Sequence, residues 1–433
     1  FSIHVHEASE TMMIQYKTLF SAIHEKDFEE TSQLLSLFDS SSCLNTRNSD
    51  GFTLLSHAAF NGAVDIIQLL LNNPRVDPNK TQIDGATPFL VACRQGYEEV
   101  VQLLLQDKRI DVQKCDDSEI TPFYISCSEG YVPIVKLLLN DPRVDINQAP
   151  VSKKTPFYIA CEKGKIEVVK LLLNDERTLI NERSSSGKHP FHIACEKGHL
   201  DIVKILLDDK RSDFCDGGCC ITPFFLACQQ GHLEVVKLLL ADNRMNIKKE
   251  NHYSMSPFFV ACQNGHLEIV KVLLQDERID VNEKNKNEET PFLVACKNGH
   301  LEIVKLLLKD PRVQINAADI GGSTPFLKAC QNEELEIVKL LLTDQRVDIE
   351  KPGIDGVTPF HLLCELGQCE IIKNILASER KIVLNEKLAI KLCKEVCGPS
   401  KDIHHIIELL KHYEQDKEQT KLEIRKELGT LSS

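Results

Sequence analysis

Residues 222–244 read TPFFLACQQGHLEVVKLLLADNR, and nearly the same text returns as SPFFVACQNGHLEIVKVLLQDER at 256–278 and TPFLVACKNGHLEIVKLLLKDPR at 290–312. The proline of the first triplet recurs at steps of 34 residues, with one step of 33, at Pro88, Pro122, Pro156, Pro190, Pro223, Pro257, Pro291, Pro325 and Pro359. A fixed period in this range predicts a solenoid, in which each unit buries its apolar face only against its neighbours.

Each unit contains signals for two short helices. Thr222 has a hydroxyl that can cap a helix, and Pro223 suits the first helical position, where no N–H is needed. Gly231 tolerates positive φ and ends this helix A. A second helix B follows, with apolar residues at helical spacing on a predicted buried face, namely Leu233, Val236 and Leu240.

The segment after helix B is predicted to be an extended arm with a turn, as in RVDINQAPVSKK at 143–154. The order helix, turn, helix, arm, together with TPF, AC, GHLE, IVKLLL and the DIN of 145–147, resembles the ankyrin repeat, whose signature is TPLHxAA, GH and VVxxLL with an Asn-ending loop. The resemblance implies an all-α solenoid with extended arms or β-hairpin loops, capped at both ends.

We expect five segments along the chain. Residues 51–380 form ten ankyrin repeats, preceded by an N-terminal extension (1–17) and by a capping repeat with the first arm (18–50). A C-terminal capping repeat (381–412) and a charged tail (413–433) follow. The tail has only a thin apolar face, so it is either a helix docked on the last unit or on another protein, or a solvated helix.

Two departures from the ankyrin pattern predict local differences. The histidine of TPLH survives only at His192 and His361, with apolar or tyrosine side chains elsewhere, so packing between repeats should be more apolar. Glu333 stands where the other units place Gly, which predicts either a changed turn or backbone strain.

Composition narrows the function class. The net charge of -13 argues against broad attraction to nucleic acid or anionic lipid, and no apolar run is long enough for membrane insertion. The chain begins with Phe and lacks a signal peptide pattern, so we expect a trimmed or partial chain in the cytoplasm, with cytoskeletal association as an alternative. Nine cysteines in one register, from Cys93 to Cys364, fit buried reduced thiols.

No constellation in the sequence predicts catalysis or a cofactor, and the usual nucleotide, zinc-protease, hydrolase and calcium motifs are absent. We therefore expect a protein that is not an enzyme. One cluster remains open: Cys215, Cys219 and Cys220 lie in the only shortened arm, and His252 in the next arm would complete four metal ligands. Their spacing is not a standard zinc pattern, so we favour an altered turn over a metal or redox role.

Two periodic rows of polar residues have competing interpretations. The GH histidines (His199, His232, His266 and His300) are one period apart, which favours a structural role at the helix start over a metal or acid–base site. The arginines at the Asp-x-Arg positions, such as Arg143 after Asp141, either form a basic ridge or pair within the chain. We favour intrachain pairs.

The arms are the most variable part of each unit and, in ankyrin geometry, line a concave surface together with the A helices. The candidate protein-binding residues are those before TPF and a nearby tyrosine: Ile120, Lys154, Lys188, Ile221, Tyr253, Met255 and Glu289. They either recognise a partner or pack arm against arm. The resemblance implies a scaffold or adaptor that binds proteins; the alternatives are a regulatory segment of a larger enzyme or channel, a cytoskeletal component, and a metal or thiol sensor.

Overall fold

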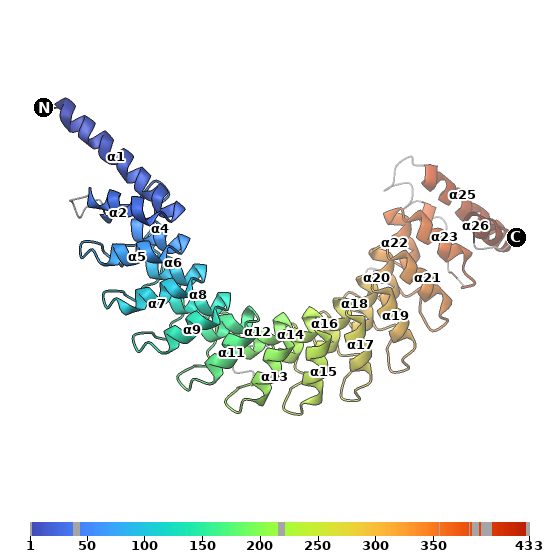
Figure 1. The fold of residues 1–433 in the computed structure, drawn as a ribbon. Helices are drawn as coiled ribbons and strands as arrows, with labels where there is room; N and C mark the ends of the chain where they lie inside the picture. The colour runs from blue at the N-terminus through green and yellow to red at the C-terminus, as the bar shows by residue number, and fades with distance from the viewer. Residues whose placement is uncertain are drawn as a thin grey trace. The chain divides into compact units, whose positions relative to one another are not determined.

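The computed structural model of the chain describes residues 2–37, 44–214, 221–354, 356–380, 382, 389–390 and 401–429. The chain divides into two compact units, Phe1–Gly218 and Cys219–Ser433. Within each unit, A and B helices alternate along the chain, each A helix packs on the A helix of the next repeat, and the B helices do the same (Figure 1).

The first unit begins with α1 (Ser2–Glu25) and α2 (Phe28–Ser36) and continues with five pairs of A and B helices. These pairs are α4 (Leu54–Asn61) with α5 (Val64–Leu71), α6 (Pro88–Gln95) with α7 (Glu98–Gln106), α8 (Pro122–Glu129) with α9 (Val132–Leu139), α10 (Pro156–Glu162) with α11 (Ile166–Leu173), and α12 (Pro190–Lys197) with α13 (Leu200–Asp208).

Within its described residues, the second unit has five further pairs and two terminal helices. The pairs are α14 (Pro223–Gln230) with α15 (Leu233–Ala241), α16 (Pro257–Gln263) with α17 (Leu267–Leu274), α18 (Pro291–Lys297) with α19 (Leu301–Leu308), α20 (Pro325–Gln331) with α21 (Leu335–Thr343), and α22 (Pro359–Leu366) with α23 (Cys369–Ala377). The terminal helices are α25 (Lys401–Gln415) and α26 (Lys417–Glu427).

The predicted start and end of helix A are confirmed in α14, and the same start recurs in most of the other units. Thr222 accepts a hydrogen bond from the Phe225 N–H at 3.0 Å, Pro223 is the first helical residue, and Gly231 ends α14 at φ +85°. The repeat that starts with His189 is an exception, because that side chain makes no capping hydrogen bond. Among the residues that the structure describes there is no β-strand, and turns hold the arms.

The core of each repeat is made by the Phe of the TPF triplet and by helix B. The eight triplet phenylalanines from Phe89 to Phe326 are buried in the described structure. The predicted face of α15 is wrong at two positions, since the buried residues are Val235, Val236 and Leu239 while Leu233 and Leu240 are half-buried. Helix B contacts its own A helix and the neighbouring B helices. Its buried face is therefore centred on Val235, Val236 and Leu239, which lie between Leu233 and Leu240 in the sequence.

The positions that replace the TPLH histidine are buried, as expected for apolar packing between A helices. They are Leu90, Tyr124, Tyr158, Phe225, Phe259, Leu293 and Leu327, and none is more than 8% exposed. Burial raises the pKa of the two tyrosines to about 12, so they stay neutral near neutral pH.

Both ends of the repeat array are covered by helices whose bounds differ from the expected segments. At the N-terminus, α1 runs without a break through the expected boundary at 17/18 and packs on α2 and α4. At the C-terminus, α25 crosses the boundary at 412/413. Within the expected capping repeat 381–412, most of residues 381–400 lie outside the described residues.

The C-terminal tail forms a docked helix rather than a solvated one. Helix α26 packs on α23 and α25, and Ile424 is fully buried. Arg425 Nε donates to the Ala377 carbonyl at 2.9 Å, at the end of α23, and its guanidinium pairs with Glu379. Glu427 accepts from Lys373 and contacts His405 at 2.9 Å each, which ties three helices together.

Candidate functional site

The arms form a row of hairpin turns. In the hairpin at residues 82–86 the Gln82 N–H donates to the Ala86 carbonyl at 2.8 Å, and the Gly85 N–H donates to the Gln82 carbonyl at 3.2 Å. Each turn comprises five residues, numbered here from the first, such as Gln82, to the fifth, such as Ala86. The fourth residue has positive φ, at Gly85 and equally at the non-glycine residues Glu119, Lys153, Ser254 and Glu288. The sequence of the turn therefore varies more than its conformation.

Neighbouring hairpins are joined by backbone hydrogen bonds. The second residue of one turn donates its N–H to the third residue of the preceding turn, as from Asp117 to Asp84 at 3.0 Å and from Ser185 to Ser152 at 2.8 Å. In the second unit, Lys286 donates to Tyr253 in the same way at 3.0 Å. We call the surface made by these hairpins and the exposed side of the A helices the hairpin face.

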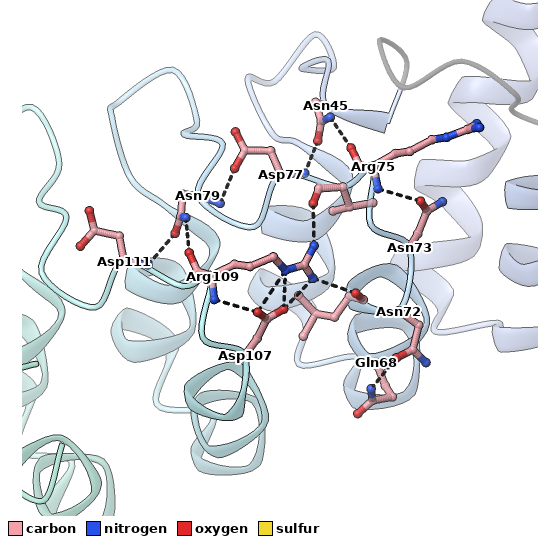
Figure 2. A network of polar contacts seen from close by, with 12 residues as sticks. Asn45, Gln68, Asn72, Asn73, Arg75, Asp77, Asn79, Asp107, Arg109 and Asp111 are labelled. Atoms are coloured by element: carbon pink, nitrogen blue, oxygen red, sulfur yellow. Dashed lines mark hydrogen bonds and ion pairs between the residues drawn. The ribbon is translucent and has the colours of Figure 1, made fainter.

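Asparagine side chains hold several of the arms to the next one (Figure 2). Asn79 Nδ2 donates to the Arg109 carbonyl at 2.6 Å, and Asn79 Oδ1 accepts from the Asp111 N–H at 2.8 Å. Asn45 makes the same pair of bonds to Arg75 and Asp77 one repeat earlier. These bonds satisfy backbone groups of an arm that belongs to no helix or sheet.

The Asp-x-Arg row is paired within the chain, as predicted. Arg109 contacts Asp107 at 2.6 Å, and its guanidinium also donates to the Leu71 carbonyl at 2.8 Å, at the end of the preceding B helix (Figure 2). The hydrogen bond from Arg109 lowers the pKa of Asp107. The same ion pair recurs in the described repeats at Arg143, Arg177, Arg211, Arg244, Arg278, Arg312 and Arg346. These arginines therefore do not form a free basic ridge.

Models of ankyrin repeats in three copies match residues 55–149, 123–216, 209–285, 276–352 and 311–387. The chain belongs to the ankyrin-repeat family. The overlapping matches cover well over half of its residues and agree with the helix pairs of the structure. A comparison with curated proteins finds no significant match. None of the helices in the described part of the chain has the length and apolar character needed to cross a bilayer.

The residues before the TPF triplet of the ankyrin repeats are half-buried or buried. Ile120, Lys154, Lys188, Ile221 and Met255 are half-buried, and Glu289 is buried at 7% exposure.

Charged residues at this position are held inside their own ankyrin repeat. Lys154 pairs with Glu162 at 2.9 Å, Lys188 pairs with Glu196, and Glu289 pairs with Lys297 at 2.9 Å. The partner lies eight residues later, in the last turn of helix A or next to it. The arm and this end of helix A therefore face the same side of the repeat.

The exposed apolar residues of the ankyrin hairpins lie at the tips instead. Of the seven predicted residues, only Tyr253 is at a tip, with 55% exposure. Sequence reasoning missed four others, each at the second residue of a turn: Ile83 (75%), Val151 (77%), Ile320 (67%) and Ile354 (83%). Their shared register in the period was the available signal. Ile320 and Ile354 are on neighbouring hairpins, whereas the others are separated by at least one repeat.

The GH histidines are structural, as predicted. Nε2 of His199, His266 and His300 lies 2.8–3.0 Å from a carbonyl oxygen at the end of the preceding A helix. The His199 ring also covers Gly164, where an added Cβ would lie 2.7 Å from the ring. Glycine is therefore required twice at this turn, for its positive φ and for the histidine above it. His232 holds the same position at the start of α15.

The turn at Glu333 was predicted to have either a changed conformation or backbone strain. Glu333 keeps the glycine conformation at φ +62°, and α21 begins two residues later as in other ankyrin repeats. The turn is unchanged, so the residue carries backbone strain.

The periodic cysteines are buried, and burial raises the pKa of the Cys93 thiol to about 12. Such thiols do not form the reactive thiolate near neutral pH. Cys215, Cys219 and Cys220 lie outside the described residues, and His252 is exposed beside Tyr253. Over the ranges described, no group of three or more His, Cys, Asp or Glu side chains is arranged for a metal ion.

Proposed function

We propose that this ankyrin-repeat protein is a non-catalytic scaffold or adaptor that binds protein partners along its hairpin face. The observation that carries the proposal is the contrast between two surfaces. Along six of the described B helices, an exposed acidic residue pairs with a lysine three residues later, as in Glu234 with Lys237 at 2.8 Å. At the hairpin tips, large apolar side chains such as Val151 and Ile354 are more than three-quarters exposed. Exposed apolar anchors on a rigid frame are typical of recognition surfaces.

The cytoplasm is the proposed location. The buried thiols support it, because a chain with this many free cysteines suits a reducing compartment. Labelling the chain with a fluorescent tag and comparing its distribution with cytoskeletal and organelle markers tests this location. Retention with the cytoskeleton after detergent extraction would favour the cytoskeletal alternative.

Crosslinking capture from native cell extract tests the binding face. We compare the wild-type chain with a hairpin variant carrying Val151→Asp, Tyr253→Asp, Ile320→Asp and Ile354→Asp. The predicted residues Ile120, Ile221 and Met255 are unsuitable, because aspartate at half-buried positions would disturb folding.

A matched control places the same four charges on the other side of the repeats. Exposed uncharged residues there are replaced in the variant Gln102→Asp, Asn140→Asp, Asn174→Asp and Gln275→Asp. We expect partners to be lost by the hairpin variant and kept by the control, with both variants folded by circular dichroism. Loss of the same partners in both variants, or in neither, would contradict binding through the hairpin face.

A further inference from the structure

Within the first unit, the charge of the hairpin face changes sign between two adjacent repeats. Counted over equal stretches of hairpin and helix A, residues 114–130 have a net charge of -3, residues 148–164 of +2, and residues 182–198 of +1, with His neutral. The charged residues of the first stretch are Lys114, Asp116, Asp117, Glu119 and Glu129. Those of the next two are Lys153, Lys154, Glu162 and Lys163, then Glu182, Arg183, Lys188, Glu196 and Lys197.

Internal ion pairs remove part of this charge but not the change of sign. Asp116 is held by Arg94 at 2.7 Å, Lys154 by Glu162, and Lys188 by Glu196. Nine of these charged groups make no ion pair within the described parts of the chain, and their net charge keeps the same change of sign. The acidic ones are Asp117, Glu119, Glu129 and Glu182, and the basic ones are Lys114, Lys153, Lys163, Arg183 and Lys197. All are exposed except Arg183, which is half-buried.

These groups share one side of three consecutive repeats. Helix α8 packs on α10, and α10 packs on α12. Val151, which is 77% exposed, lies at the hairpin tip where the acidic stretch meets the basic one. The surface therefore offers an acidic area and a basic area with an apolar residue near their junction.

We propose that this part of the hairpin face binds an extended protein segment in which a block of basic residues and a block of acidic residues flank an apolar residue. The basic block lies over the hairpin and helix end of α8, and the acidic block lies over those of α10 and α12. The inference rests on the proposed function and adds the chemistry of the partner. Charge complementarity of this kind governs orientation and specificity in protein association.

A nucleic acid fits this surface less well. Its phosphates would be attracted by residues 148–198 but repelled by the adjacent residues 114–130 and by a chain with a net charge of -13. A segment that carries both signs matches the net charge of each of the three stretches.

The dimensions set the length of the segment. Neighbouring helices pack about 10 Å apart and an extended chain advances about 3.3 Å per residue, so each repeat accommodates about three residues. Three to four repeats therefore accommodate about 9–12 residues. Side-chain charges do not define the direction of the peptide backbone, so either order of the two blocks along the peptide can bind.

The experiment uses two fluorescein-labelled peptides of about 12 residues with the same composition. One peptide has its lysines and glutamates in two blocks around leucine, and the other alternates them. Fluorescence anisotropy with the full chain measures both dissociation constants at about 50 mM and 500 mM NaCl, where the Debye length falls from about 14 Å to about 4 Å. We expect the block peptide to bind at least about tenfold tighter at low salt and to lose this advantage at high salt.

Charge-reversal variants of the protein test where the acidic block of the peptide binds. We expect Lys163→Glu with Lys197→Glu to weaken binding of the block peptide about tenfold, because two attractions become repulsions. The matched control is Lys108→Glu with Lys136→Glu, two exposed lysines on the B-helix side, and it should change affinity less than about twofold. A photo-crosslinker at the acidic end of the peptide should label residues 148–198, and one at the basic end should label residues 114–130.

Three results would overturn the inference. The first is that both peptides bind with equal affinity, or that neither binds. The second is that the control variant loses as much affinity for the block peptide as Lys163→Glu with Lys197→Glu does. The third is that a 12-nucleotide single-stranded RNA binds more tightly than the block peptide and that Lys163→Glu with Lys197→Glu abolishes this binding. The last result would assign the basic area to nucleic acid. If the peptides fail while partner capture still depends on the hairpin tips, the charge inference falls and the proposed function stands.

Discussion

At the scale of the residue, the turn between helices A and B is limited by two separate physical constraints on glycine. Gly265 has φ +78°, and a Cβ there would lie 2.7 Å from the His300 ring of the next repeat. Gly187, in a hairpin, has nearly the same φ of +77° but no atom within 4 Å of an added Cβ. Comparing these two glycines separates backbone strain from steric overlap.

We therefore expect Gly265→Ala to destabilise the protein more than Gly187→Ala. The second change costs about 1 kcal/mol of unfolding free energy for the positive φ alone, and the first costs about 2–3 kcal/mol because the His300 ring must also move. Urea unfolding followed by circular dichroism measures both. Adding His300→Ala to each variant should narrow the gap, and equal costs for the two glycines would show that the histidine does not constrain the turn.

A second prediction at this scale concerns pH. Burial raises the pKa of Glu283 to about 7, and the neighbouring Glu250 and Asp280 act in the same direction while a hydrogen bond with Ser256 opposes them. The folded pKa lies above the ordinary value of 4.5. Between pH 4.5 and 7 the folded chain thus binds more protons than the unfolded chain at this site, and its stability falls as pH rises.

Glu283→Gln removes this titration. We expect the variant to match the wild type at pH 4 and to exceed it at pH 8 by on the order of 1 kcal/mol, a value discounted for the half-exposed position. Thermal unfolding of both proteins across this range is the measurement. Glu129→Gln, at an exposed position, is the control and should give a pH-independent difference; the same flat difference for Glu283→Gln would contradict the prediction.

At the scale of the element, α26 covers the end of α23 with a hydrogen bond of the kind that the next repeat supplies elsewhere. In the repeats before it, the arginine of the following arm donates to the end of helix B, as Arg346 does to the Leu308 carbonyl at 2.7 Å. Beyond α23, Arg425 of α26 takes this role at the Ala377 carbonyl and pairs with Glu379. A single helix thereby satisfies the carbonyl that an additional repeat would otherwise cover.

We expect Arg425→Ala to loosen α26 and the last turn of α23. The loss of a charge-assisted hydrogen bond to a carbonyl costs about 1–2 kcal/mol of local stability. Hydrogen exchange followed by mass spectrometry should show faster exchange in these two helices and no change in α16 or α18. Lys426→Ala, one residue on and exposed, should leave exchange unchanged; if both variants behave alike, Arg425 is not the capping group.

The elements show which features the sequence could predict. Helix A was predictable because its signals are local: Thr222 caps it, Pro223 starts it and Gly231 ends it within ten residues. The buried face of helix B was misplaced at Leu233 and Leu240, because that face depends on neighbours on two sides. The docking of α26 depends on Arg425 meeting Ala377, 48 residues earlier, and no local pattern encodes that contact.

The candidate site was predictable only in part for a related reason. The period located the arms, but the exposure of a position depends on how the turn is built. The residue before TPF pairs across its own repeat, as Lys154 does with Glu162, and is therefore half-buried. The most exposed position is the second residue of the turn, where Val151 and Ile354 lie, and that assignment requires the turn geometry.

At the scale of the whole molecule, stability is built from contacts between neighbours. Within each unit, each described A helix packs on its own B helix and on an adjacent A helix, and the main contacts of a repeat are with its neighbours. We propose that residues 18–50 and 381–412 act as end caps of this one-dimensional array. In such an array a local defect should affect its neighbours and fade with distance.

Phe157→Leu tests this view of the molecule. Phe157 is buried at 1% exposure in α10, and a leucine there leaves a cavity that costs about 1–2 kcal/mol. Because α10 packs on α8 and α12, we expect hydrogen exchange to accelerate in those three helices and to stay unchanged in α18 and α20 of the second unit. Phe60→Leu, at a side chain that is 41% exposed, is the control and should alter exchange little. Uniform acceleration through both units would show that the chain opens as one cooperative body, and the nearest-neighbour description would then be wrong.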